Sequence, residues 1–303
     1  MNRDNDELLI PETLLPQIPG GDLEPRLRVI RRLSTGTAHR NWHIRTARGD
    51  FVLRAPNPAM PMMSERDFER ELLLQRHAAA QGMAPKVFAC NRPQRSMVME
   101  YIDGTQWADG DFREALRLSE LCSRLAQLHA VTAPAVPAFD PLSNIQSYAR
   151  QLLAAMPPDS AGIDAKVTAA TRIWTSGGAS AQSSAILHCD PHAGNLISRG
   201  AAMGSSAIVL LDWEYAQVGD PILDFAALCS YYPQAEPVVT RWLAAAPAPG
   251  AGVLQRRLRG AIGVFCVLNW LWYRVRAMRI SLAAADVAQM QQLDGRIDAL
   301  LLA

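Results

Sequence analysis

The stretch I-L-H-C-D-P-H-A-G-N-L-I, from Ile186 to Ile197, and the later stretch I-V-L-L-D-W-E, from Ile208 to Glu214, decide how this chain folds. Asp190 stands two positions after a histidine and five positions before Asn195. This is the spacing H-x-D-x-x-x-x-N, in which the Asp accepts the proton of an attacking hydroxyl and the Asn binds Mg²⁺. The second stretch has an apolar run that ends at Asp212, where a second metal-binding Asp is expected.

These three side chains form a chemical set. Phosphoryl transfer requires hard oxygen ligands for Mg²⁺ and one further carboxylate beside the hydroxyl nucleophile. Asn195 and Asp212 are the predicted metal ligands, and Asp190 is the predicted catalytic base. An H-x-D triplet alone, or an apolar run that ends in Asp, also occurs as ordinary structure. The order and spacing of all three residues therefore carry the prediction.

The segments around these residues resemble a known family. The family is that of the aminoglycoside phosphotransferases and choline kinase-like small-molecule kinases, which are relatives of the protein kinases. Its catalytic loop is similar to the segment H-C-D-P-H-A-G-N of this chain, and its D-x-D/E metal segment is similar to L-D-W-E-Y-A-Q-V-G-D-P-I-L-D-F-A. The resemblance runs from about Leu33 to about Arg276.

The resemblance implies an α+β, two-lobed protein kinase-like fold. Its small N-terminal lobe would contain an antiparallel sheet and one main helix, and its larger C-terminal lobe would be mostly helical. We expect the nucleotide-binding lobe at residues 1–98, the hinge at 99–104, and the catalytic and acceptor-binding lobe at 105–303.

Composition restricts the classes of function. With 303 residues, 49% of them hydrophobic, the chain can form two domains of about 100 to 200 residues each. The net charge of +1 lacks the basic excess of nucleic-acid-binding proteins, so we expect no nucleic-acid partner. No apolar run approaches the roughly 18 residues of a membrane span, and the first residues do not resemble a signal peptide. Five scattered cysteines favour reduced thiols, and we expect a cytoplasmic location without a membrane span.

Alternating apolar residues predict three antiparallel strands at Leu27–Leu33, His39–Arg45 and Phe51–Arg54. The segment S-T-G-T-A between the first two strands carries Gly36, where the family has its phosphate-binding loop. The family more often has two glycines there. This segment is therefore either an ordinary hairpin turn or a loop whose backbone amides approach the phosphates of ATP.

Two charged residues follow from the same resemblance. Arg54 occupies the position where protein kinases carry the lysine that binds the α and β phosphates, and choline kinase-like proteins often have arginine there. A serine N-cap and acidic first turns predict a helix at Ser64–Gln81. Glu71 in this helix is the expected partner of Arg54, and Glu69 is the rival. The alternative is that the arginine and both glutamates are merely solvated.

The strand R-S-M-V-M-E-Y-I-D-G leads into the expected hinge, where the backbone of Glu100 and Ile102 would hydrogen-bond to adenine. Apolar spacing predicts further helices at 112–130, 144–156, 163–175 and 253–279. Only about eight residues separate Asp212 from the next helix, which is too few for the activation segment with which protein kinases dock a peptide. We therefore expect a small acceptor.

Trp270, Trp272 and Tyr273 are similar to the aromatic segment with which choline kinases hold a quaternary ammonium group. An aromatic-rich helix can equally well be part of the core, and both interpretations stay open. Glu214 is a further candidate for acceptor contact. After residue 220 the chain has five acidic residues and eight arginines, which offers little to a polycationic aminoglycoside.

The sequence thus indicates a phosphotransferase that uses ATP and Mg²⁺ to phosphorylate a hydroxyl group of a small molecule. Amino alcohols similar to choline, ethanolamine or thiamine are the first acceptor class, and aminoglycosides or sugars are the alternative. A nucleotide-binding regulatory pseudokinase is the non-enzymatic alternative, because the single-glycine loop and Arg54 depart from the usual kinase pattern. The sequence leaves the acceptor, the preference for ATP over GTP and the oligomeric state open.

Overall fold

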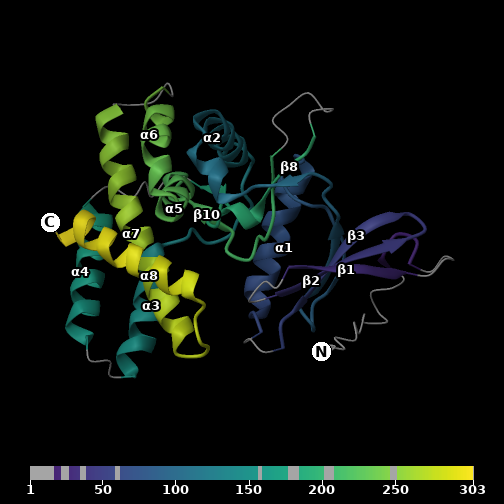
Figure 1. Cartoon of the computed structure of the whole chain (residues 1–303), viewed down its shortest axis with the longest axis horizontal. Coiled ribbons are helices and arrows are strands. Elements are labelled where there is room, and N and C mark those ends of the chain that lie inside the picture. Colours follow the sequence, from purple (N-terminus) through teal and green to yellow (C-terminus); the bar gives the residue numbers. More distant parts are fainter. Residues whose placement is uncertain are drawn as a thin grey trace. The chain divides into compact units, whose positions relative to one another are not determined.

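The computed structural model describes residues 17–21, 27–34, 39–58, 62–155, 159–176, 184–200, 208–245 and 251–302. These residues form two compact units (Figure 1). Unit 1 comprises the described residues up to Thr105 together with Ile197–Glu214, and unit 2 comprises Gln106–Leu196 and the described residues from Tyr215 onward. The domain boundaries predicted from the sequence put residues 197–214 in the C-terminal lobe. The segment belongs to unit 1 because it packs there, and the Leu210 N–H donates a hydrogen bond of 2.8 Å to the carbonyl of Met83.

Unit 1 contains a five-stranded antiparallel sheet and one long helix. The strand order is β1-β2-β3-β5-β4, and the helix α1 spans Glu65–Ala80. The three strands predicted from alternation are confirmed, each to within a few residues. The strands are β1 (Arg28–Ser34), β2 (His39–Thr46), β3 (Gly49–Pro56), β4 (Val87–Asn91) and β5 (Ser96–Glu100).

The two faces of this sheet carry separate apolar clusters. One face is built on Trp42, Ile44, Phe51, Leu53 and Val98. On the opposite face Met97 of β5 packs against Phe68 and Leu72 of α1. Because successive side chains of a strand point to opposite faces, Arg54 lies on the same face as α1. The helix begins where the sequence predicts, since the Ser64 hydroxyl accepts a hydrogen bond of 3.1 Å from the Asp67 N–H.

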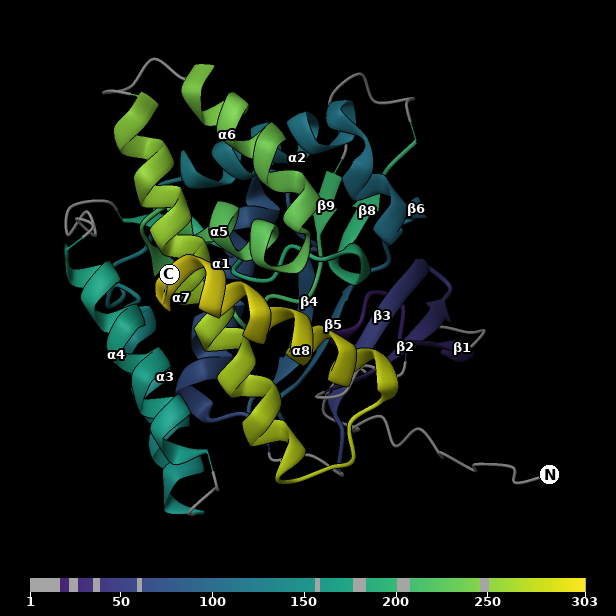
Figure 2. The same cartoon turned by 60° about the vertical axis from the view of Figure 1, so that its left-hand side comes forward.

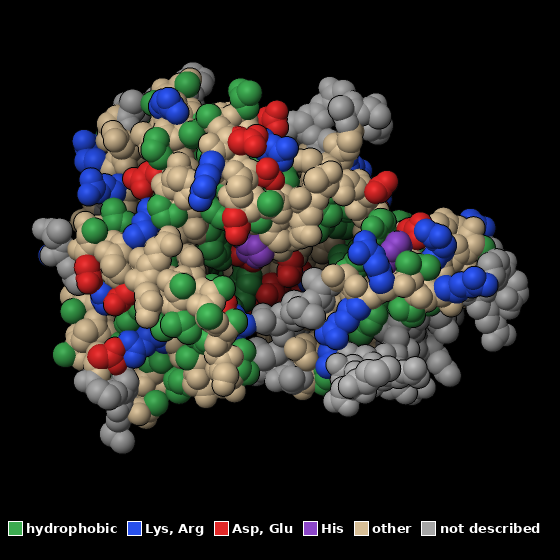
Figure 3. Space-filling view, in the orientation of Figure 1, with side chains coloured by type: hydrophobic (Ala, Val, Ile, Leu, Met, Phe, Trp, Pro, Cys, Tyr) green, Lys and Arg blue, Asp and Glu red, His purple; other side chains and the backbone are tan. Residues whose placement is uncertain are grey.

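Arginine side chains cover the outer strands of unit 1. Figure 3 shows Lys and Arg side chains gathered over β1 and β2. β1 lies at the edge of the sheet, and charged side chains on an edge strand discourage pairing with strands of another molecule. The exposed arginines of this region are Arg28, Arg31, Arg32, Arg45 and Arg48.

A short three-stranded sheet, in the order β6-β8-β9, follows the end of β5 along the chain. Its strands are β6 (Thr105–Gln106), β8 (Leu196–Ser198) and β9 (Ile208–Leu210). Gly104 lies against β8 so closely that a Cβ atom would be 2.4 Å from the carbonyl oxygen of Ser198. Only glycine fits this approach.

Unit 2 is built around one long helix, α7, which packs against α3, α4, α5, α6 and α8 (Figure 2). α5 is buried along nearly its whole length, because its residues are almost all apolar or small. The predicted helices are confirmed with shifted ends, whereas α6 and α8 were not predicted. The helices are α2 (Ala115–His129), α3 (Pro141–Ala154), α4 (Ser160–Ser176), α5 (Ile222–Tyr231), α6 (Glu236–Ala245), α7 (Ala251–Ala277) and α8 (Ala284–Ile297).

Two short strands of unit 2, β7 (Ala185–Leu187) and β10 (Gln217–Gly219), pair with each other in antiparallel orientation. β7 ends where the stretch H-C-D-P-H-A-G-N begins, so the sheet supports the loop that carries the predicted base. In the part of the chain that the structure describes, no helix has the length and apolar character required to cross a membrane.

Candidate active site

A buried carboxylate holds the backbone of the loop that follows β7. Asp224 of α5 is fully buried and accepts hydrogen bonds from the N–H of His188 at 3.1 Å and from the N–H of Cys189 at 2.7 Å. His129 of α2 lies 2.8 Å from the same carboxylate through Nε2. Cys189 adopts a φ of 63°, a left-handed conformation that is unfavourable for a side chain with a Cβ. Such a conformation persists only where the surroundings enforce it, and Asp224 provides that constraint.

The same loop brings Asp190 and Asn195 together. The Asn195 Nδ2 group donates to the Asp190 Oδ2 at 2.8 Å and to the Asp190 carbonyl at 3.0 Å. The hydroxyl of Tyr231 donates to the other carboxylate oxygen, Oδ1, at 2.7 Å. His192 Nε2 lies 3.5 Å from Oδ2. Asp190 is thus fixed in one orientation by side chains from the loop and from the end of α5.

These neighbours control the charge of Asp190. Burial alone would raise the pKa of Asp190, but the hydrogen bond and charge of His192, together with the Tyr231 hydroxyl, hold this pKa below its ordinary value. Burial and the nearby carboxylate raise the pKa of Tyr231 well above its ordinary value. At neutral pH the arrangement is therefore a carboxylate that accepts a hydrogen bond from a neutral phenol.

In unit 1, Arg54 and Glu71 form a buried pair. The Arg54 Nη2 donates to Glu71 Oε2 at 2.6 Å, and Nη1 donates to the other carboxylate oxygen. The Arg54 side chain is 3% exposed and that of Glu71 is fully buried. Glu69, the rival from the sequence, instead pairs with Arg92 at the surface. The helical period explains the difference, because residues two positions apart on α1 point in different directions.

Arg54 also reaches the predicted metal residue. Its Nη1 lies 3.4 Å from Asp212 Oδ1. Burial works to lower the pKa of Arg54, but the charge and hydrogen bonds of Glu71 outweigh it and raise this pKa above its ordinary value. Arg54 is therefore a permanent cation, fixed by Glu71 and placed beside Asp212.

Asp212 has an uncommon backbone conformation, with a φ of 54°. The following residue, Trp213, is fully buried and donates a hydrogen bond of 2.9 Å from Nε1 to the Leu210 carbonyl. This anchor fixes the turn after β9. His39, at the start of β2, and Glu214 lie beside Asp212, with His39 Nδ1 3.2 Å from Glu214 Oε2. Burial, together with the charge of Arg54, lowers the pKa of His39 to about 4.

The expected nucleotide-binding segments are described in part. The Glu100 N–H donates to the Lys86 carbonyl at 2.8 Å, and the Glu100 side chain pairs with Arg199. The backbone N–H of Glu100 is thus engaged within unit 1, and the contacts of the backbone around Glu100 and Ile102 with adenine stay a prediction. The side chain of Ile102 is buried. Gly36 lies outside the described residues.

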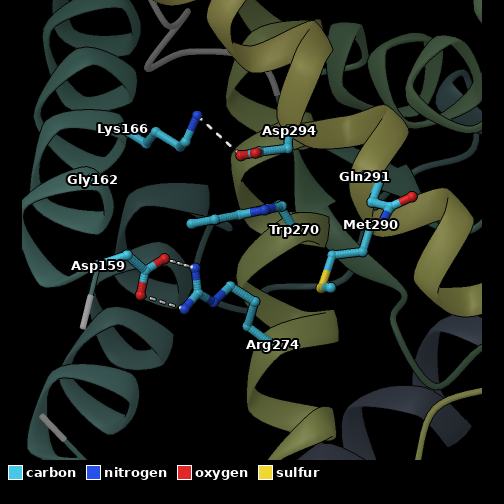
Figure 4. A pocket seen from close by; sticks show the side chains of 8 residues that line it. All are labelled: Asp159, Gly162, Lys166, Trp270, Arg274, Met290, Gln291 and Asp294. Carbon is cyan, nitrogen blue, oxygen red and sulfur yellow. Dashed lines mark hydrogen bonds and ion pairs between the residues drawn. The ribbon is translucent and has the colours of Figure 1, made fainter. Parts of the chain in front are cut away.

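The three candidate aromatic residues have different surroundings. Trp270 is 5% exposed and lies beside a cavity of about 350 Å³ between α4, α7 and α8. Figure 4 shows Lys166 and Arg274 on opposite sides of its ring, with their charged atoms 5.5 Å and 4.7 Å from the ring centre. Lys166 is anchored 3.1 Å from Asp294, and Arg274 by two hydrogen bonds to Asp159. The faces of Trp270 are therefore occupied by cations of the chain itself.

Trp272 and Tyr273 lie further along the same helix. The guanidinium of Arg276 is 5.1 Å from the Trp272 ring, and the Tyr273 ring packs edge-on against Trp272 at 4.9 Å. Burial and the charge of Asp286 raise the pKa of Tyr273, and the charge of Asp190 adds a smaller rise. The hydroxyl of Tyr273 therefore lies within the electrostatic range of the predicted base.

The sequence of the chain matches the model of the phosphotransferase enzyme family over residues 29–261. The chain belongs to this family. Its fold is similar to that of a choline/ethanolamine kinase family protein from Mesorhizobium loti, with 22% identity, a TM-score of 0.70, and coverage of 90% of this chain and 88% of that one. Choline kinase LicA from Streptococcus pneumoniae gives 15% identity, a TM-score of 0.67, and coverage of 89% and 95%.

A third similar structure is a thermostable mutant of the aminoglycoside phosphotransferase APH(4)-Ia in a ternary complex with ADP and hygromycin B. It gives 15% identity, a TM-score of 0.67, and coverage of 93% of this chain and 96% of that one. A search of curated protein sequences found no match to this phosphotransferase. The resemblance inferred from the sequence and the α+β, two-lobed protein kinase-like fold are confirmed.

Two tyrosines beside the loop that carries the predicted base were not predicted from the sequence. Tyr231 donates to Asp190, and the hydroxyl of Tyr232 accepts from the Ala193 N–H at 3.0 Å and bonds to Asp109 at 3.0 Å. The sequence signal is the pair S-Y-Y-P at the end of α5. It could have attracted notice because polar aromatic residues end an otherwise apolar helix, but the sequence does not show that these residues reach the loop.

Proposed function

We propose that this phosphotransferase transfers the γ-phosphate of ATP to a hydroxyl group of a small molecule, with amino alcohols similar to choline, ethanolamine or thiamine as the first acceptor class. The observation that carries the proposal is the state of Asp190, an ionised and mostly buried carboxylate that Asn195 and Tyr231 hold in a single orientation. A fixed carboxylate of this kind suits a base that receives the proton of an attacking hydroxyl.

The reaction would be a substitution at the γ-phosphorus of ATP. The acceptor oxygen forms a bond to the γ-phosphorus, the bond from that phosphorus to the bridging oxygen of ADP breaks, and the hydroxyl proton passes to an Asp190 oxygen. Arg54, fixed by Glu71, would bind the α and β phosphates. The backbone around Glu100 and Ile102 would hold adenine.

Asn195 and Asp212, the two metal ligands predicted from the sequence, each offer an oxygen atom of the kind that Mg²⁺ binds. Both amide hydrogens of Asn195 are used in donating to Asp190, so its Oδ1 is the atom that it can offer to a cation. The Asp212 carboxylate is partly exposed, and carboxylate and amide oxygens are the ligands that Mg²⁺ prefers. A metal ion held by these residues would neutralise charge on the phosphates of ATP.

The environment of the rings supports a specific version of the amino alcohol proposal. An ammonium group on either face of Trp270 would have to displace Lys166 or Arg274, because each already lies over the ring. The charge of Asp190, beside which the hydroxyl of an acceptor would be deprotonated, acts on the hydroxyl of Tyr273. We therefore assign ammonium contact to Tyr273 and leave Trp270 as part of the packing. The ring of Trp272 already has the guanidinium of Arg276 over it, so it is not the first candidate either.

The proposal is tested by a panel of acceptors and one isosteric variant. ADP release above the background with ATP alone should appear with an amino alcohol and exceed that with aminoglycosides or sugars. Asp190→Asn should lower kcat by a factor of about 10² to 10⁴ and leave ATP affinity nearly unchanged, because the carboxylate acts on the hydroxyl.

The matched control is Asp164→Asn, which makes the same chemical change at an exposed position on α4. It should retain wild-type turnover. If Asp190→Asn keeps activity to within about threefold of wild type, Asp190 is not the base. If ATP binds but no acceptor in the panel increases ADP release, the pseudokinase alternative replaces the proposal.

A further inference from the structure

His39, Asp212 and Glu214 converge in unit 1, although 173 or more residues separate the histidine from the two acids. One ligand atom from each side chain lies within 4.8 Å of the other two. A single metal ion can contact three atoms at that spacing, since metal-to-ligand bonds in proteins are about 2.0 to 2.6 Å long.

The charge around this cluster favours a divalent cation. Glu71, Asp212 and Glu214 carry three negative charges, and Arg54 carries one positive charge. Two negative charges remain in a region where Glu71 and Arg54 are almost completely buried. Glu71 already uses both carboxylate oxygens on Arg54, so the excess charge lies on the side of Asp212 and Glu214. A cation of charge +2 would balance it.

His39 supplies the independent observation. Its side chain is 5% exposed, and its Nδ1 atom has no hydrogen-bond partner among the described residues. The nearest carboxylate oxygen, Oε2 of Glu214, is 3.2 Å away without hydrogen-bond geometry. A buried polar atom without a partner costs about 1 to 3 kcal/mol and therefore requires an explanation. Coordination of a metal ion by Nδ1 would provide one.

We propose that His39, Asp212 and Glu214 form a divalent-cation site in which the imidazole Nδ1 is a ligand, and that this site selects Mn²⁺, Co²⁺ or Zn²⁺ over Mg²⁺. Imidazole nitrogen suits transition metals, whereas Mg²⁺ prefers ligands that are all oxygen. The inference rests on the proposed function for the metal-binding role of Asp212. It adds a nitrogen ligand and a metal preference, and it assigns Glu214 to the cation and not to the acceptor.

The test uses the full chain, stripped of metal and without nucleotide or acceptor. Mn²⁺ binding is followed by electron paramagnetic resonance, and pulsed measurements of the bound ion show whether a nitrogen nucleus is coordinated. Wild type should bind Mn²⁺ at least about tenfold more tightly than Mg²⁺ in competition, and the bound ion should show nitrogen coupling. His39→Asn should remove the nitrogen signal and weaken Mn²⁺ binding by at least about tenfold.

His43→Asn is the matched control, because His43 lies on the same strand but pairs with Asp50 at 2.7 Å and stacks on Tyr101 at 4.0 Å. It should keep both the affinity and the nitrogen signal. Glu214→Gln should weaken Mn²⁺ binding and retain the nitrogen signal at saturating metal. The wild-type spectrum alone decides the matter if a variant does not fold.

Absence of nitrogen coupling in wild type, its persistence in His39→Asn, or equal affinity for Mg²⁺ and Mn²⁺ would each overturn the inference. These outcomes are distinct from failure of the proposed function. Phosphotransfer with Mg²⁺ and ATP but without a nitrogen ligand would leave the function standing and remove this site. If Mn²⁺ binds with a nitrogen ligand but no acceptor is phosphorylated, the metal site stands and the proposed function fails.

Discussion

Replacing Glu71 by glutamine should destabilise the chain strongly, because it removes the counter-charge of a buried guanidinium. Glu71 is fully buried and Arg54 is 3% exposed, so water cannot take the place of the lost carboxylate. Glutamine has nearly the same shape and keeps one acceptor oxygen, so the change isolates charge from packing. Breaking a buried ion pair by removing one partner costs about 3 to 5 kcal/mol, since an uncompensated charge is left behind.

The structure places the expected value for Glu71→Gln at the lower end of that range. Asp212 lies 3.4 Å from Arg54 Nη1 and retains part of the compensation, although its side chain is 36% exposed and its charge is partly screened by water. We expect a loss of about 3 kcal/mol in the free energy of unfolding. At roughly 2 to 4 °C per kcal/mol for a domain of this size, the melting temperature should fall by about 6 to 12 °C.

Urea unfolding followed by tryptophan fluorescence, together with thermal melting, measures this loss. The control is Glu69→Gln on the same helix, whose carboxylate pairs with Arg92 where both side chains are at least 40% exposed. Exposed ion pairs contribute about 0 to 1 kcal/mol, so this variant should behave almost like wild type.

A second variant shows whether the loss of stability comes from the unpaired charge of Arg54 or from altered packing. The double change Arg54→Met with Glu71→Leu should recover most of the stability lost in Glu71→Gln, because it removes both buried charges and keeps apolar volume. The reasoning is refuted if Glu71→Gln and Glu69→Gln differ by less than about 0.5 kcal/mol, or if the double variant is less stable than Glu71→Gln.

Four further predictions concern the loop, the aromatic helix and the thiols. Tyr231→Phe removes a hydrogen bond that helps to lower the pKa of Asp190, so the acid limb of the kcat/KM profile should move to higher pH. An unchanged profile would show that the phenol does not control the base. Trp270 is buried, so Trp270→Leu should lower the free energy of unfolding by on the order of 3 kcal/mol and leave the KM for the acceptor unchanged. A raised acceptor KM with a normal melting temperature would instead place this ring in the acceptor site. Burial raises the pKa of the Cys122 thiol to about 12, so this thiol stays protonated and unreactive at pH 8. A thiol reagent at pH 8 should therefore label the half-buried Cys90 first. Fast labelling of several thiols in the native chain would contradict the burial of the other cysteines. Because the unfolded chain releases the Cys122 proton near pH 9 and the folded chain retains it, stability in urea should decrease as the pH rises above about 9, and this part of the decrease should be absent in Cys122→Ala.

Local patterns in the sequence determined the elements and the order of the reacting groups. Alternation of apolar residues predicted β1, β2 and β3, and a serine N-cap predicted the start of α1 at the correct residue. The spacing of Asp190 and Asn195 predicted their proximity because they lie five positions apart in one loop. Patterns of this kind depend on the geometry of a single segment, which short-range sequence order specifies.

Tertiary packing decided the partners of these groups. The orientation of α1 directs Glu71, and not Glu69, toward Arg54. The end of α5 brings the hydroxyl of Tyr231 to the carboxylate of Asp190, which lies 41 positions earlier in the chain. The packing of α4 against α7 placed Lys166 over the ring of Trp270, a contact that the sequence does not indicate. These contacts join segments whose separation along the chain carries no information about their distance in space. Only the burial of apolar faces, which fixes how helices and strands pack, brings such side chains together.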